Sequence, residues 1–343
     1  MILKRHKLPH TLVRKEPKML KIALALGTEP NPVWTLAQQA GVEHVVGSIN
    51  LNPIPDASDE EQPWSYKSLA RVKAAYADAG FSLQVIESRP PMEKIKLGLP
   101  GRDEEIDVVR ELIRNMGALE IPVWCPAWMP ILMVLRTSRT IPSRGDSQVT
   151  GYDHSEMEDA LTEHGVITEE QQWDSLKYFL ESVVPVAEEA NVRLAMHPDD
   201  PPLSPIRGVA RIMSSIENYQ KLIDLVPSPI NGIALCQGNF TLMTDDLPNV
   251  IRHFGGQQKI FFTHFRDVRG TPENFQEAFH DDGQTDMAAC IRAYRDVGYD
   301  GVSRPDHFPK MGNNEFEDQY SMARLFAIGY MKGLLEAVYS EQI

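Results

Sequence analysis

The chain has 343 residues, 42% hydrophobic and 24% charged, which is typical of a folded globular protein. Its formal net charge of −14 argues against nucleic acid as the main partner, because a phosphate backbone requires a basic surface. No apolar stretch approaches the roughly 18 residues that cross a bilayer, and three cysteines without a secretory leader indicate a reducing compartment, so we expect a cytoplasmic protein.

Residues 1–18 carry six lysines and arginines and are expected to form a basic N-terminal arm ahead of a catalytic domain over residues 19–343. From Lys21 onward, a short β-prone run repeatedly ends in polar, Gly or Pro residues, and a segment with helical periodicity follows. The eight β-prone runs lie at 21–27, 44–51, 82–88, 123–128, 193–198, 232–238, 259–265 and 301–307.

Helical segments lie between these runs, and the clearest cover 65–80, 103–117, 174–192, 286–298 and 321–338, whereas the first, around 33–41, is short. Strands that alternate with helices predict parallel pairing, because each parallel connection needs a crossover. Eight units in this length predict a single-domain (β/α)8 TIM barrel. The Pro- and Met-rich stretch at about 130–168 is expected to be a long insertion after the fourth strand, and such a loop is usually functional or mobile.

An open doubly wound sheet is the competing topology. No G-x-G-x-x-G motif follows any strand, and no Walker-type lysine loop is present, which weakens the nucleotide-binding form of that alternative.

The last four predicted strands end in His197, Cys236, His264 and Asp306. Active sites of TIM barrels form at these strand ends. Two imidazoles, a thiolate and a carboxylate suit a divalent transition metal such as manganese, iron, cobalt or zinc. Each residue also has an ordinary structural alternative, such as a buried apolar cysteine or a helix-capping aspartate, but their occurrence on four consecutive strand ends favours a metal site.

Groups suited to proton transfer and anion recognition accompany these ligands. His307 follows Asp306 directly, and histidine is a residue type suited to general acid or base catalysis. Tyr320 could donate a phenolic proton, with ordinary helix packing as the alternative. Arg266 and Arg304 are typical of anion recognition, because a guanidinium pairs bidentately with a carboxylate, although a rim salt bridge is the favoured alternative for Arg304.

The chain resembles the mannonate dehydratase family, metal-dependent lyases with a xylose-isomerase-like TIM barrel. The resemblance extends from Pro185 to the C-terminus and is strongest at 184–202, 236–240, 260–267, 280–287, 304–308 and 320–334. It implies hexuronate breakdown, in which water is lost by β-elimination from an aldonic acid to give a 2-keto-3-deoxy acid. It also implies a homo-oligomer, either a dimer or a tetramer.

The resemblance further implies roles for individual residues. The ligands of Mn²⁺, or alternatively of Fe²⁺ or Co²⁺, would be His197, Cys236, His264 and Asp306. The acid–base pair would be His307 and Tyr320. The residues at the substrate would be Glu87, Arg266, His280 and Arg304.

The first half of the chain resembles the family less closely. Met92 stands where the family typically has histidine, and Met133 stands where it usually has aspartate. We therefore expect a sugar-acid dehydratase whose physiological substrate need not be D-mannonate. On this hypothesis Met92, Trp128 and Met133 admit a less hydroxylated or substituted sugar acid, with contacts supplied by residues 130–168 as the alternative.

Two other functions stay open at this level. A sugar or sugar-acid isomerase or epimerase would begin with the same deprotonation beside a metal. A non-catalytic binding or regulatory homologue of the enzyme belongs to a different class.

Overall fold

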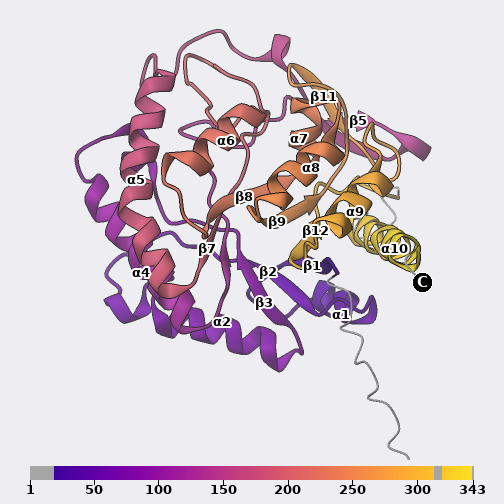
Figure 1. The fold of residues 1–343 in the computed structure, drawn as a ribbon, viewed down its shortest axis with the longest axis horizontal. Coiled ribbons are helices and arrows are strands. Elements are labelled where there is room, and N and C mark those ends of the chain that lie inside the picture. The colour runs from indigo at the N-terminus through magenta and orange to yellow at the C-terminus, as the bar shows by residue number, and fades with distance from the viewer. Residues whose placement is uncertain (1–18, 313–318, 342–343) are drawn as a thin grey trace, which may run out of the picture.

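A closed barrel of eight parallel strands forms the centre of the protein (Figure 1). The computed structural model describes residues 19–312 and 319–341. Around the barrel the strand order is β1-β12-β9-β8-β7-β4-β3-β2, and β2 pairs with β1. The barrel strands are β1 (Lys21–Gly27), β2 (His44–Ser48), β3 (Ser82–Ile86), β4 (Val123–Trp124), β7 (Arg193–Met196), β8 (Asn231–Cys236), β9 (Ile260–Phe265) and β12 (Val302–Pro305). The predicted TIM barrel is confirmed, and the open sheet is wrong. The expected basic arm lies outside the described residues.

Helices cover the outside of the barrel, and α4 and α5 lie side by side along one flank (Figure 1). The longest predicted internal helix begins at Glu169 rather than Asp174, because Thr168 and Gln171 form a capping box. The described helices are α1 (Pro32–Gln39), α2 (Tyr66–Asp78), α3 (Glu93–Leu97), α4 (Arg102–Ala118), α5 (Glu169–Ala190), α6 (Ile216–Leu225), α7 (Gln237–Met243), α8 (Leu247–Gly256), α9 (Met287–Asp296) and α10 (Gln319–Ser340). Within the described ranges, no helix combines the length and apolarity that a bilayer span requires.

Side chains of alternating direction divide the apolar core into two layers. Those that point inward fill the barrel and are mostly small, including Ala23, Val46, Val85, Ala195 and Ala234. Those that point outward pack against the helices in a larger cluster. The barrel is therefore filled below its C-terminal end, so polar groups gather only at the strand ends.

A second, antiparallel sheet has the strand order β10-β11-β6-β5. The segment predicted as a long loop supplies β5 (Ser138–Pro142) and β6 (Gln148–Asp153). The connection after β9 supplies β10 (Val268–Thr271) and β11 (Asn274–Glu277). Phe275 of β11 lies opposite Tyr152 of β6, and both pack in a third apolar cluster with Ile206. The β5–β6 hairpin is therefore joined through β6 to the distant β10–β11 hairpin, which the sequence of residues 130–168 does not reveal.

The close approach of α4 and α5 gives a stability prediction. A Cβ atom on Gly117 would lie 2.5 Å from the carbonyl oxygen of Ala190, so Gly117→Ala should destabilise the fold by about 1–3 kcal/mol. Gly329 of α10 is exposed, and no atom lies within 4 Å of the added Cβ, so Gly329→Ala should stabilise by roughly 0.5–1 kcal/mol. Thermal unfolding midpoints check both signs. An unchanged midpoint in Gly117→Ala would show that the two helices separate readily.

Candidate active site

Three of the four predicted ligands form one compact group at the C-terminal end of the barrel. The ligand atoms of His197, Cys236 and His264 all lie within 4.8 Å of one another. Their side chains are buried, because β7, β8 and β9 are neighbours in the barrel and end at the same level. Asp306 follows β12 and lies beside this group, with Oδ2 at 3.3 Å from Nδ1 of His264. We call these four residues the metal cluster.

The donor atoms of the metal cluster suit a single cation. Atoms that coordinate one ion at about 2.0–2.3 Å lie roughly 3–4 Å from each other. Nε2 of His197 and Nδ1 of His264 are 3.3 Å apart, within this range. The other ring nitrogen of His197, Nδ1, is 2.8 Å from the carbonyl oxygen of Pro198, and as its donor it leaves Nε2 free for coordination.

Glu87 and Arg304 hold the metal cluster from the β3 side. Nε2 of His264 lies 3.1 Å from Oε1 of Glu87, although the direction is not that of an ideal hydrogen bond. Arg304 donates two hydrogen bonds of 2.7 Å to Glu87 and a third of 2.7 Å to Oδ1 of Asp306. The rim salt bridge favoured for Arg304 at the sequence level is therefore present. Its guanidinium orients Asp306 so that Oδ2 remains directed at His264.

Charge around the metal cluster favours a cation. Burial alone would raise the pKa of the Cys236 thiol, but Arg266, at 3.4 Å from the sulfur, and hydrogen bonds from both histidines hold it well below its usual value. Burial and Arg304 lower the pKa of His264, yet Glu87, Asp306 and Cys236 raise it well above the ordinary value. A thiolate and two carboxylates thus attract positive charge to His264. A metal ion fits this demand, and a proton competes with it.

Arg266 lies behind the metal cluster in a buried ion-pair network. It donates to Asp200 at 2.9 Å, to Asn239 at 2.6 Å and to Glu277 at 2.6 and 2.9 Å. Arg136, which precedes β5, donates to the same two carboxylates. Arg266 is 1% exposed, so in this structure its donors face protein carboxylates rather than open space. The network links the second sheet to the metal cluster.

His307 lies between the network and the metal cluster. Its Nδ1 is 3.4 Å from Oε1 of Glu277, and its Nε2 is 3.6 Å from Oδ2 of Asp306. Its side chain is 26% exposed, and its backbone has a left-handed φ of 49°. Asp306 and His307 therefore project differently from adjacent positions. Glu277 and Asp200 were not predicted as site residues from the sequence, although "DD" directly after His197–Pro198 was a signal for Asp200.

Two other predicted site residues have different surroundings. His280 is 1% exposed and its ring stacks on Phe265 at 5.8 Å. Burial lowers the pKa of His280 to about 4, so its imidazole is neutral at pH 7. Tyr320 is 46% exposed in the first turn of α10. The structure therefore brings Glu87, Arg266, Arg304 and His307 to the metal cluster, whereas His280 belongs to an aromatic wall.

The apolar residues expected to shape the substrate pocket do not act together. Trp128 is 1% exposed, packs on Phe179 and donates to Gln172, so it belongs to the core beside α5. Its expected role in admitting the substrate is wrong. Met92 is 2% exposed at the floor of a cavity of about 420 Å³, and Met133 is 37% exposed. Of these three apolar residues, Met92 and Met133 remain candidates for contact with a ligand.

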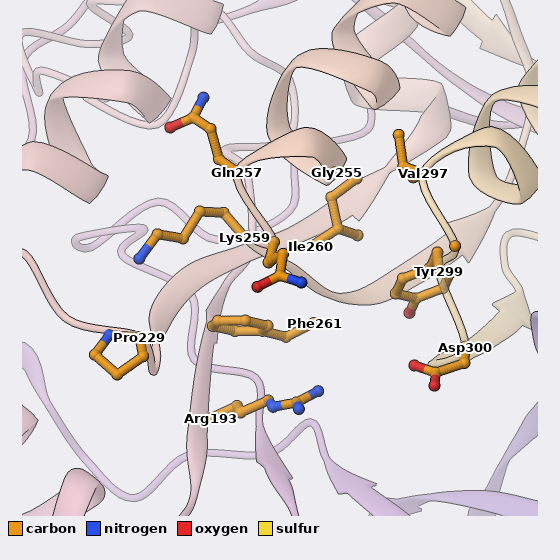
Figure 2. Close-up of a pocket in the computed structure, with 12 residues that line it drawn as sticks. Arg193, Pro229, Gly255, Gln257, Lys259, Ile260, Phe261, Val297, Tyr299 and Asp300 are labelled. Carbon is orange, nitrogen blue, oxygen red and sulfur yellow. The ribbon is translucent and has the colours of Figure 1, made fainter. Parts of the chain in front are cut away.

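A separate cavity of about 360 Å³ lies at the opposite end of the barrel (Figure 2). Arg193 and Phe261 line it, with the Arg193 guanidinium 5.4 Å from the ring centre. No residue of the metal cluster lines this cavity. Because the N-terminal end of a TIM barrel generally serves stability, we do not place the active site there.

Comparison with known proteins identifies the family and the fold of the chain. The family model described as D-mannonate dehydratase (UxuA) matches residues 26–167 and 160–343. Mannonate dehydratase 2 of Halalkalibacterium halodurans is 35% identical over 306 residues, covering 81% of this chain and 88% of the relative. Mannonate dehydratase of Thermotoga neapolitana is 34% identical over 340 residues, covering 88% and 92%. The crystal structure of mannonate dehydratase from Streptococcus suis serotype2 superimposes with a TM-score of 0.86 at 29% identity and covers 95% of each chain. The chain therefore belongs to the mannonate dehydratase family of hydro-lyases.

Proposed function

We propose that the protein is a metal-dependent dehydratase that removes water from a sugar acid, either D-mannonate or a relative of it, to give a 2-keto-3-deoxy acid. The observation that carries this proposal is the proximity of His197, Cys236 and His264, with Asp306 beside His264. Family membership favours dehydration over isomerisation or epimerisation and over a non-catalytic role. Hexuronate catabolism is the corresponding metabolic setting.

We assign the cation as Mn²⁺, with Fe²⁺ or Co²⁺ as alternatives, held by the four residues of the metal cluster. When bound, the cation would supply Lewis acidity that stabilises the negative charge developing as the C2 proton leaves. Arg304 and Glu87 would position Asp306 and His264 for coordination. Arg266 would keep Cys236 ionised. Arg304, Glu87 and Arg266 were expected at the substrate from the sequence and are thus proposed to act mainly through the ligands. His280 is proposed to be an uncharged residue in the wall of the site.

His307 is proposed as one proton-transfer group and Tyr320 as the other. The contact with Glu277 would orient the His307 ring while it accepts or delivers a proton. Protonation of the departing C3 hydroxyl would complete the elimination. We further propose that the protein is a homo-oligomer, either a dimer or a tetramer. We also propose that it is cytoplasmic, because its three free cysteines agree with a reducing compartment.

The ligand role of Cys236 is tested by metal analysis. Cys236→Ser should lower manganese occupancy at least tenfold at limiting metal with little change in fold, because one of four ligands becomes a poor donor. Cys290→Ala is the matched control, since Cys290 is buried in α9 and burial raises the pKa of its thiol to about 12. Elemental analysis and circular dichroism give both readouts. Full occupancy in Cys236→Ser would remove the sulfur from the coordination sphere.

The reaction class is tested by product analysis. The manganese-loaded protein, screened against aldonic and uronic acids, should form a keto-deoxy product that thiobarbiturate or semicarbazide detects. Chelation should abolish this product, and added manganese should restore it. A product isomeric with its substrate would contradict dehydration and favour an isomerase.

The role of His307 is tested by substitution. His307→Asn should retain the metal and lower kcat by roughly 10²–10⁴-fold, because proton transfer is lost. Asparagine tolerates the left-handed φ of 49°, so the loop should stay intact. Persistent turnover in this variant would show that another residue transfers the proton.

A further inference from the structure

A cavity of about 420 Å³ opens beside the metal cluster, at the C-terminal ends of β2 and β3. Glu87 lines it and also contacts the ligand His264 at 3.1 Å, so the cavity borders the proposed reaction centre. Asn50 and Asn52 add amide groups on the β2 side, and these suit sugar hydroxyls. Arg89 lines the same cavity.

Arg89 differs from the other arginines near the metal cluster because it has no counter-ion. Arg136 and Arg266 pair with Asp200 and Glu277, and Arg304 pairs with Glu87 and Asp306. Among the described residues, Arg89 forms no ion pair, and it donates a hydrogen bond to the sulfur of Met133, a weak acceptor.

The nearby Glu93 favours the charged form of Arg89 through space but forms no ion pair with it. Its two carboxylate oxygens accept from Lys96 at 2.7 Å and from the backbone N–H of Ile131 at 2.8 Å. The remaining guanidinium nitrogens of Arg89 are not fully buried, so solvent reaches them.

The backbone around Arg89 is rigid. Pro90 and Pro91 follow it, and the hydroxyl of the preceding Ser88 accepts from the N–H of Ile49 at 3.0 Å. The carbonyl of Ser88 accepts from the indole of Trp124 at 2.9 Å. Burial lowers the pKa of Arg89, although Glu93 and Cys125 act in the opposite direction. A preorganised, partly desolvated cation of this kind is suited to an anionic ligand.

We propose that Arg89 binds a second acidic group of the substrate, so that the preferred substrate is a sugar acid with an anionic group at each end. The metal cluster takes the carboxylate next to the carbon that loses its proton, and Arg89 takes a carboxylate or a phosphate at the far end. This inference rests on the proposed dehydratase function and names the substrate class for it.

The test compares substrates that differ only at C6: D-mannonate, its C6-oxidised diacid D-mannarate, and D-mannonate 6-phosphate. The manganese-loaded protein should show a kcat/KM at least tenfold higher for one of the doubly acidic compounds than for D-mannonate. Preference for the diacid identifies the far group as a carboxylate, and preference for the phosphorylated acid identifies it as a phosphate.

Substitutions test whether Arg89 is the residue that causes the preference for doubly acidic substrates. Arg89→Met should abolish it by raising KM for the doubly acidic substrate at least tenfold, while kcat/KM for D-mannonate stays within about threefold. Arg89→Lys should retain part of it, and Arg71→Met, which changes an exposed arginine on α2, should behave as wild type. Equal losses on all three substrates, or a wild-type preference for D-mannonate, would overturn the inference.

Failure of the dehydratase proposal is distinguishable from failure of this one. If no compound gives a keto acid, calorimetric titration of the manganese-loaded protein with D-mannarate and with D-mannonate 6-phosphate decides. Binding of either compound that weakens at least tenfold in Arg89→Met, but not in Arg71→Met, would support the anion site without dehydration. Binding that is absent, or that does not depend on Arg89, would reject it.

Discussion

In a closed parallel barrel, the C-terminal ends of β7, β8, β9 and β12 meet at one level, and this closure makes neighbours of residues far apart in the chain. Glu87 and Arg304 are 217 positions apart, yet they form a bidentate pair at 2.7 Å. An open sheet would leave β1 and β12 at or near separate edges and could not connect the β3 and β12 ends in this way. The ligands and the residues that orient them therefore depend on the same ring of backbone hydrogen bonds.

Burial of many charges at this end of the barrel is tolerated because almost every one has a partner. Asp200 and Glu277 each contact two arginines, and Arg304 contacts Glu87 and Asp306. Breaking one partner from a buried pair typically costs several kcal/mol, so the arginines fix the carboxylates in place. Two features around the site are proposed to bind charged ligands. The metal cluster would bind a cation, and Arg89 would bind an anion.

The barrel was predictable because each strand is a short apolar run and each helix has its own periodicity. The proximity of His197, Cys236, His264 and Asp306 was predictable because all four lie at the C-terminal ends of barrel strands, and their role as metal ligands stays a prediction. The second sheet was not predictable, since β6 pairs not only with its neighbour β5 but also with β11, more than a hundred residues away. Local sequence carries no record of such a pairing.

The direction in which each side chain points was the other feature that could not be predicted from the sequence. Arg266 was expected to meet an anion and does, but the anions are protein carboxylates. Trp128 follows a strand end, yet its ring turns outward to Phe179 and Gln172. Arg89 also follows a strand end, in "SRPP", and its significance emerges only when the other arginines are seen to be paired.

The central claim is that two imidazoles, one thiolate and one carboxylate bind the same ion. Anomalous diffraction from crystals grown with manganese measures this most directly. We predict one strong anomalous peak within about 2.0–2.6 Å of His197 Nε2, Cys236 Sγ, His264 Nδ1 and Asp306 Oδ2. A peak elsewhere in the protein, or none at this point under saturating manganese, would contradict the account.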